Sequence, residues 1–148
     1  MLGEHPEQRR QLVEDRSLIP NTIEETLRFE PTGPHIARYV ARDAEYYGTT
    51  VPAGSAMLLL VGSGNRDERH FADPDRFDIR RPNAADHLSF GSGPHFCLGA
   101  PLARLEARVV LEELTAAVPS LRLVPQQRYE FMPIIAFRGP KAVEVECD

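Results

Sequence analysis

Residues 90–99 read Phe-Gly-Ser-Gly-Pro-His-Phe-Cys-Leu-Gly, and this cysteine loop leads directly into the longest amphipathic segment of the chain. A cysteine just before a helix lies near the positive end of the helix dipole and near free backbone N–H groups. Both features favour the thiolate over the thiol. Cys97 is therefore the first candidate for a chemical role.

The other residue types of the loop fit the same interpretation. Glycines let a backbone approach a flat partner closely because they carry no Cβ atom, and large aromatic side chains shield a site from water. The glycines are Gly91, Gly93 and Gly99, and the aromatic residues are Phe90 and Phe96. A shielded thiolate in such a loop is suited to act as an anionic metal ligand.

Three other interpretations of Cys97 are open on the residues alone. A free cysteine is most often a small buried hydrophobic residue. A nucleophilic Cys–His pair with His95 is a second interpretation, although residues two apart in a loop seldom bring imidazole onto sulfur. A zinc site is the third, but neither a second cysteine nor a spaced pair of histidines accompanies Cys97.

The segment after the loop predicts a helix over residues 98–118, which Pro119 ends. One face carries an apolar stripe at helical spacing and the adjacent face carries small residues against which another element could pack closely. The stripe consists of Leu98, Leu102, Leu105 and Val109, and the small residues are Ala100, Ala103 and Ala107.

Before the loop, residues 4–15 predict a helix that Pro20 breaks, and a second helix begins at Asn21 or Thr22 and stops before Pro31. Short strands are expected at 36–40, 44–47 and 56–61, the last of them buried. Residues 65–82, the irregular segment, predict a long loop. Residues 121–145 alternate enough to predict strands and a hairpin.

Length and composition favour one globular domain, since the chain has 148 residues with 42% hydrophobic and 26% charged. The net charge of -5 gives no reason to expect nucleic acid or an anionic membrane. No apolar run approaches the roughly 18 residues of a membrane span, so the cytoplasm is the expected compartment. The two cysteines do not form a disulfide framework.

The cysteine loop resembles that of the cytochrome P450 family. Phe90, Gly93, His95, Cys97 and Gly99 occupy every defined position of the signature Phe-x-x-Gly-x-His-x-Cys-x-Gly, and the residues after the loop (100–106) also look like the soluble bacterial members. The resemblance implies that Cys97 is the thiolate ligand to the iron of haem b. It also implies that the loop residues Phe90, Gly91, Gly93, His95 and Gly99 border the haem.

The resemblance implies further roles outside the loop. Glu25 and Arg28 match a Glu-x-x-Arg motif, which in this family forms a buried network with an arginine of the irregular segment, and Arg76 stands where that third partner is expected. Haem carries two propionates that need cations or strong donors. Arg38 matches the propionate-binding arginine, and His95 matches the propionate-contacting histidine of the loop.

By resemblance, residues 1–148 are a single partial domain, the C-terminal haem-ligating part of a mainly helical α+β fold. The expected function is haem-thiolate binding within a monooxygenase that hydroxylates a small organic substrate with O2 and electrons from a ferredoxin-type donor. The helix that activates oxygen is expected to be absent from this chain, and with it the catalytic residues. The alternatives are an inactive truncated fragment and a non-catalytic haem-binding module.

Overall fold

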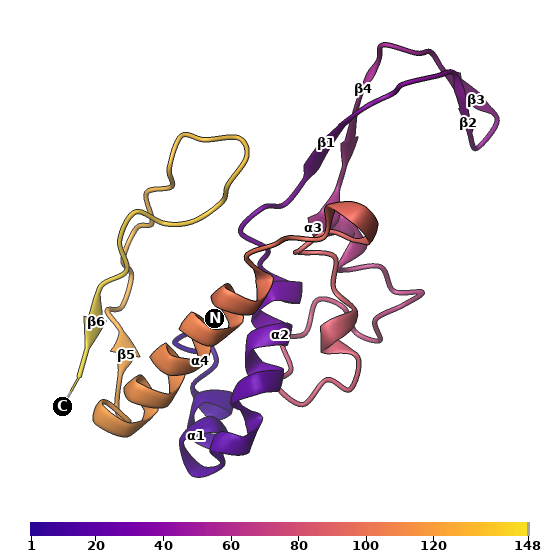
Figure 1. Ribbon diagram of the computed structural model, residues 1–148. Helices are drawn as coiled ribbons and strands as arrows, with labels where there is room; N and C mark the ends of the chain where they lie inside the picture. Colours follow the sequence, from indigo (N-terminus) through magenta and orange to yellow (C-terminus); the bar gives the residue numbers. More distant parts are fainter. Residues whose placement is uncertain (148) are drawn as a thin grey trace.

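The packed part of the molecule is built from helices α1 (Pro6–Glu14), α2 (Ile19–Phe29) and α4 (Ala100–Ala117), as Figure 1 shows for this computed structural model, which describes residues 1–147. Helix α2 packs against α4 and also against a short 3-10 turn, η2 (Ala84–Asp86). The core is a cluster of buried apolar side chains from α1, α2 and the irregular segment. Its members are Leu12, Ile19, Ile23, Phe77 and Ile79.

Helix α2 begins earlier than the sequence predicts, because Pro20 lies inside its first turn and does not break it. Proline is tolerated there, since the first N–H groups of a helix have no partner within it. The break falls instead at Asp15, whose side chain accepts a hydrogen bond from the Ser17 amide (3.0 Å) and opens the 3-10 turn η1 (Arg16–Leu18). Helix α2 ends at Phe29, before Pro31 as predicted.

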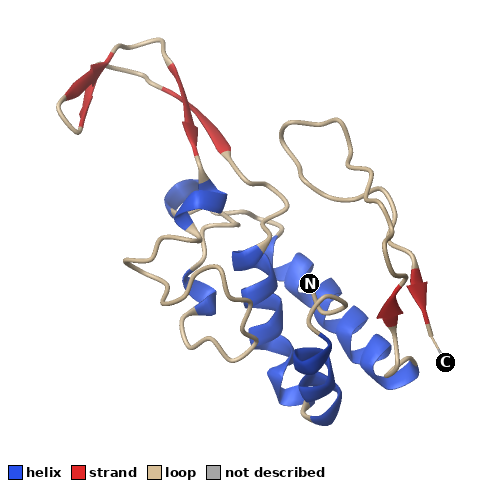
Figure 2. Cartoon of the chain, turned by 180° about the vertical axis from the view of Figure 1, so that it is seen from behind, coloured by secondary structure: helices blue, strands red, loops and turns tan. Residues whose placement is uncertain are grey.

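A two-stranded arm extends away from the helices (Figures 1 and 2). Strand β1 (Ile36–Tyr39) pairs antiparallel with β4 (Ala56–Leu59), with Ile36 opposite Leu59. At its tip β2 (Ala44–Tyr46) pairs with β3 (Thr49–Val51). The connecting residues Tyr47 and Gly48 both have positive φ (48° and 77°), which is the backbone that a tight hairpin turn requires.

Two predictions for the apolar run 56–61 differ from the structure. Strand β4 ends at Leu59, and Val61 begins the short helix α3 (Val61–Gly64). The strand is not buried either, because Leu58 and Leu59 are exposed. The physical reason is that the arm extends away from the helices (Figure 1), so within the described residues Leu58 and Leu59 are left without a covering element.

The irregular segment has no α-helix or β-strand in its residues 65–82, as predicted. The last part of the chain contributes β5 (Arg122–Leu123) and β6 (Val145–Glu146), which pair antiparallel. Between them a single bridge joins Phe131 to Pro140. The predicted hairpin is therefore present, but its paired strands are short.

Helix α4 uses its alanine face to pack, and its predicted apolar stripe faces outward. Ala100 is fully buried and Ala107 packs against the core. Leu102 and Leu105 are exposed, and Leu98 lies before the helix with 98% of its surface exposed. Among residues 1–147, no helix combines the length and the apolar character needed to cross a membrane.

Candidate functional site

The cysteine loop is held in a tight shape by its own backbone. The Cys97 amide donates to the Phe90 carbonyl (2.9 Å), and the Phe96 amide donates to the Gly93 carbonyl (3.0 Å) at the 3-10 turn η3 (Gly93–His95). Gly91 and Gly93 have φ of 72° and 68°, a left-handed backbone that other residues adopt only with strain. These two positions therefore need glycine to let the loop close.

Cys97 is exposed, which excludes the interpretation of a buried structural cysteine. Its Sγ lies beside the start of α4, since a Cβ built on Gly99 would be 3.7 Å from it. Within residues 1–147 the backbone amides of Leu98 and Gly99 have no hydrogen-bond acceptor. The thiol is accordingly open to a ligand on one side and next to free N–H donors on the other.

Strand β1 lies against the cysteine loop. The Cδ1 atom of Ile36 would be 3.7 Å from a Cβ on Gly91. Alternate residues of a strand share a face, so Arg38 belongs to the same face of β1 as Ile36. The Arg38 side chain is exposed and its one hydrogen bond in the described chain goes to the neighbouring Ala37 carbonyl (3.0 Å).

His95 is also exposed, and within the described residues its imidazole has no hydrogen bond or ion pair. Next to the thiol, Phe96 and Leu98 present exposed apolar surface. A haem with two propionates requires a soft sulfur donor, a backbone without Cβ atoms, apolar surface and two basic side chains that are free to bind the propionates. The residues present therefore fit this cofactor.

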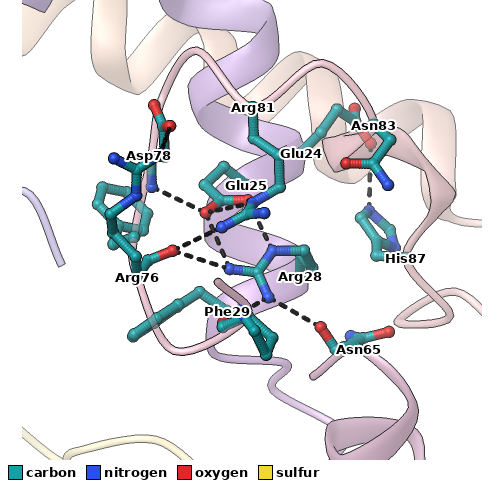
Figure 3. A network of polar contacts seen from close by, with 12 residues as sticks. Glu24, Glu25, Arg28, Phe29, Asn65, Arg76, Asp78, Arg81, Asn83 and His87 are labelled. Carbon is teal, nitrogen blue, oxygen red and sulfur yellow. Dashed lines mark hydrogen bonds and ion pairs between the residues drawn. The ribbon is translucent and has the colours of Figure 1, made fainter. Parts of the chain in front are cut away.

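A buried ion pair on α2 lies at the centre of a network of polar contacts (Figure 3). Glu25 and Arg28 are both fully buried, and Arg28 donates through Nε to Oε2 (2.7 Å) and through Nη2 to Oε1 (2.9 Å) of Glu25. Such a bidentate pair has the strongest geometry available to these side chains. The predicted pairing of Glu25 with Arg28 is thus present.

The third partner is Arg81, and the prediction of Arg76 was wrong. Arg81 Nε donates to both Glu25 oxygens (3.1 and 3.2 Å), and its side chain is 4% exposed. The Arg76 side chain is 66% exposed and pairs with Asp78 (2.7 Å). The reason lies in the chain path, which brings only the Arg76 carbonyl inward, where Arg28 (3.2 Å) and Arg81 (2.8 Å) donate to it.

The two guanidinium groups hold the irregular segment by its backbone. Besides Glu25, they donate to carbonyl oxygens of Asn65, Ala72, Asp73, Pro74 and Arg76. Glu25 in turn accepts from the Asp78 amide (2.8 Å). Within the described residues, no buried side-chain nitrogen or oxygen is left without a partner. Side chains here satisfy backbone groups that a helix or sheet would otherwise satisfy.

A second cluster, which the sequence did not predict, joins α2 to α4. Glu24 accepts two hydrogen bonds from Arg104 (2.6 and 2.8 Å) and one from His87 (3.1 Å). Burial would raise the pKa of Glu24, but the hydrogen bonds from Arg104 and His87 outweigh it and lower the pKa from 4.5 to about 2. The sequence signal that could have indicated this cluster is the pair of adjacent acidic residues, Glu24 and Glu25.

Replacing Glu24 with glutamine is expected to lower the free energy of unfolding by about 1–2 kcal/mol at pH 7, the range for hydrogen bonds to a partly exposed charged group. The folded-state pKa is depressed, so this stabilisation is complete above pH 4.5 and is lost as the pH falls towards 2. Urea unfolding of both proteins at pH 7, 4 and 2 measures the difference.

The control is Glu112→Gln, which removes an exposed partner of Arg108 on the same helix α4 and is expected to change the stability little. A difference between wild type and Glu24→Gln that stayed constant from pH 7 to pH 2 would contradict the assignment of the ionised Glu24 as the stabilising species.

Comparison with known proteins agrees with this fold. The family described as Cytochrome P450 matches residues 1–116. Mycinamicin IV hydroxylase/epoxidase of Micromonospora griseorubida is 42% identical over 98% of this chain and 37% of its own length. A putative cytochrome P450 123 of Mycobacterium tuberculosis is 52% identical over 74% of this chain and 27% of its own length.

Solved structures give the same result. An intact type IV self-sufficient cytochrome P450 monooxygenase superposes with a TM-score of 0.96 and 46% identity, covering 99% of this chain and 19% of that one. Cytochrome P450 CREJ superposes with a TM-score of 0.95 and 43% sequence identity, and the match covers 99% of this chain and 37% of that one. The chain belongs to the cytochrome P450 family, and the predicted fold class is confirmed. It spans 27–37% of the length of these two curated relatives.

The family also settles the predicted cofactor. Cytochromes P450, including the structural neighbours, use the iron of haem b. The prediction of haem b as the cofactor is confirmed for the family to which the chain belongs.

Proposed function

We propose that this chain supplies the haem-thiolate part of a cytochrome P450 monooxygenase, with Cys97 as the ligand to iron. The observation that carries the proposal is the exposed Cys97 thiol, which lies beside the first residues of α4 in a loop closed by glycines at positive φ. The sulfur lies next to α4, and the free amides of Leu98 and Gly99 would donate hydrogen bonds to a sulfur that is bound to iron.

The remaining site residues would hold the cofactor and keep its ligand in place. Arg38 on β1 and His95 in the loop would each meet a propionate, because both are exposed and neither has an acidic partner in the described chain. Gly91 and Gly93 would give the flat ring close access to the backbone, and Phe90 would shield the sulfur from water. Hydrogen bonds from the Leu98 and Gly99 amides would tune the electron density that the sulfur donates.

When bound, a haem with a cysteine thiolate ligand supplies the activation of O2, because the thiolate favours cleavage of the O–O bond. We infer a small organic molecule as the substrate, in keeping with relatives named mycinamicin IV hydroxylase/epoxidase and vitamin D(3) 25-hydroxylase. A ferredoxin-type electron donor is part of the proposal, and so is a cytoplasmic location. One structural neighbour is described as self-sufficient.

The test is a reduced carbon monoxide difference spectrum of the purified chain after haem has been supplied. We expect the strongly red-shifted Soret band of a thiolate-ligated haem. A folded protein that takes up haem without this band would contradict ligation by Cys97. A folded protein that takes up no haem would contradict the proposed function of this chain as a whole.

A further inference from the structure

Two adjacent glutamates of α2 point to different parts of the protein. Glu25 binds the arginines that hold the irregular segment. Glu24 binds Arg104, one turn into α4, and His87, just before the cysteine loop. With 15% of its side chain exposed, Glu24 is mostly shielded from water, so these bonds compete little with solvent.

Both partners of Glu24 contact the same aromatic ring. The Arg104 guanidinium carbon lies 4.8 Å from the centre of the Phe90 ring, within the range of a cation–π contact. The His87 ring lies 5.7 Å from the Phe90 ring, between centroids. Glu24 therefore fixes two groups that together determine where Phe90 can lie.

Phe90 in turn holds the cysteine. Its carbonyl accepts the hydrogen bond from the Cys97 amide (2.9 Å), which closes the loop. Its ring also contacts Phe96 at 6.3 Å between centroids. A displacement of Phe90 would act on Cys97 through this bond.

The orientation of His87 is fixed by a second hydrogen bond. The Ser89 amide donates to His87 Nδ1 (3.1 Å), so Nδ1 is an acceptor and Nε2 carries the proton donated to Glu24. The Ser89 hydroxyl donates to the Leu27 carbonyl of α2 (2.6 Å) and accepts from Asn65 (2.8 Å). The three residues before Phe90 are thus tied to α2 at two points.

We propose that Glu24, His87 and Arg104 form a positioning clamp for the haem ligand: by fixing Phe90 they set the place of Cys97 relative to the start of α4. The proposal rests on the proposed function for the identity of the ligand. The clamp residues act through Phe90 and its hydrogen bond with the Cys97 amide.

The experiment compares Arg104→Ala with Arg108→Ala, which removes the next arginine one turn further along α4, where it pairs only with Glu112. Amide hydrogen exchange, measured by NMR on the chain without haem, is followed at Cys97 and at Asp78. The Asp78 amide bonds to Glu25 and reports on the neighbouring network. We expect exchange at Cys97 to become about tenfold faster in Arg104→Ala only, with Asp78 unchanged in both variants.

Two further variants test how the expected effect depends on the chemistry of the clamp. Glu24→Gln keeps the side-chain volume and is expected to accelerate exchange at Cys97 to a smaller extent. Arg104→Lys keeps the charge but lacks the planar fork that bonds both Glu24 oxygens and stacks on Phe90, so it should restore protection only partly. In the haem-loaded protein, Arg104→Ala should lower the fraction of the carbon monoxide complex that shows the thiolate band.

Equal acceleration at Cys97 and Asp78 would overturn the clamp, because it would indicate global destabilisation. Unchanged exchange at Cys97 in Arg104→Ala would overturn it as well. If the unmodified chain took up no haem, the proposed function would fail, whereas the exchange comparison would still decide the clamp because it needs no haem.

Discussion

Replacing Arg28 with alanine is expected to lower the free energy of unfolding by about 3–5 kcal/mol, the range for removing one partner of a buried ion pair. The change leaves the fully buried Glu25 with Arg81 as its remaining guanidinium partner, and it leaves the carbonyls of Asn65 and Pro74 without this donor. Domains are stable by only about 5–15 kcal/mol in total. Urea denaturation followed by circular dichroism measures the loss, and we expect haem uptake to fall with it.

The matched comparison is between Arg81 and Arg76. Arg81→Ala should lower the free energy of unfolding by a similar amount, because the buried Arg81 guanidinium donates hydrogen bonds to Glu25 and to three carbonyls of the irregular segment. Arg76→Ala should cost less than about 0.5 kcal/mol, since its side chain is exposed and its carbonyl is kept. Wild-type stability and haem content in Arg28→Ala would refute the role of the network.

Replacing Cys97 with alanine should abolish the thiolate Soret band of the carbon monoxide complex completely, while the fold is retained. The sulfur is the only thiol in the cysteine loop, and its exposed position means that little packing is lost. The free energy of unfolding of the protein without haem should change by less than about 0.5 kcal/mol. The paired measurement of spectrum and stability separates a lost ligand from a lost fold.

Cys147→Ala is the control for this substitution, because Cys147 is also an exposed free cysteine but lies in the segment after β6. It should leave the band unchanged. If the thiolate band survived in Cys97→Ala and disappeared in Cys147→Ala, the ligand would be Cys147, and the site built around Cys97 would be refuted.

Local geometry explains which parts of the site could be predicted from the sequence. Glu25 and Arg28 are three apart on a helix, and helical spacing alone places them on one face. Gly91 and Gly93 were predicted to let the backbone approach a flat partner, and the structure adds a second need for glycine, because both residues have positive φ. Each of these predictions depends on residues that are close in the sequence.

Predictions that depend on long-range packing were less successful. The irregular segment has no periodicity, so nothing in its sequence distinguishes Arg76 from Arg81 as the inward-facing side chain. The two faces of α4 were easier to predict. Its small-residue face was expected to allow close packing, and in the structure Ala100 is buried and Ala107 packs against the core, whereas Leu102 and Leu105 of the apolar stripe are exposed.

The way in which the irregular segment is held has a consequence for how this protein can evolve. Arg28 and Arg81 hold it mainly by carbonyl oxygens, which every amino acid provides, and Phe71 is the side chain of the segment that lies against the Arg28 guanidinium. Most positions between residues 66 and 76 can therefore change identity without loss of the shape that supports the site. We expect homologous segments to diverge in sequence and remain superposable, provided that the two arginines and Glu25 are retained.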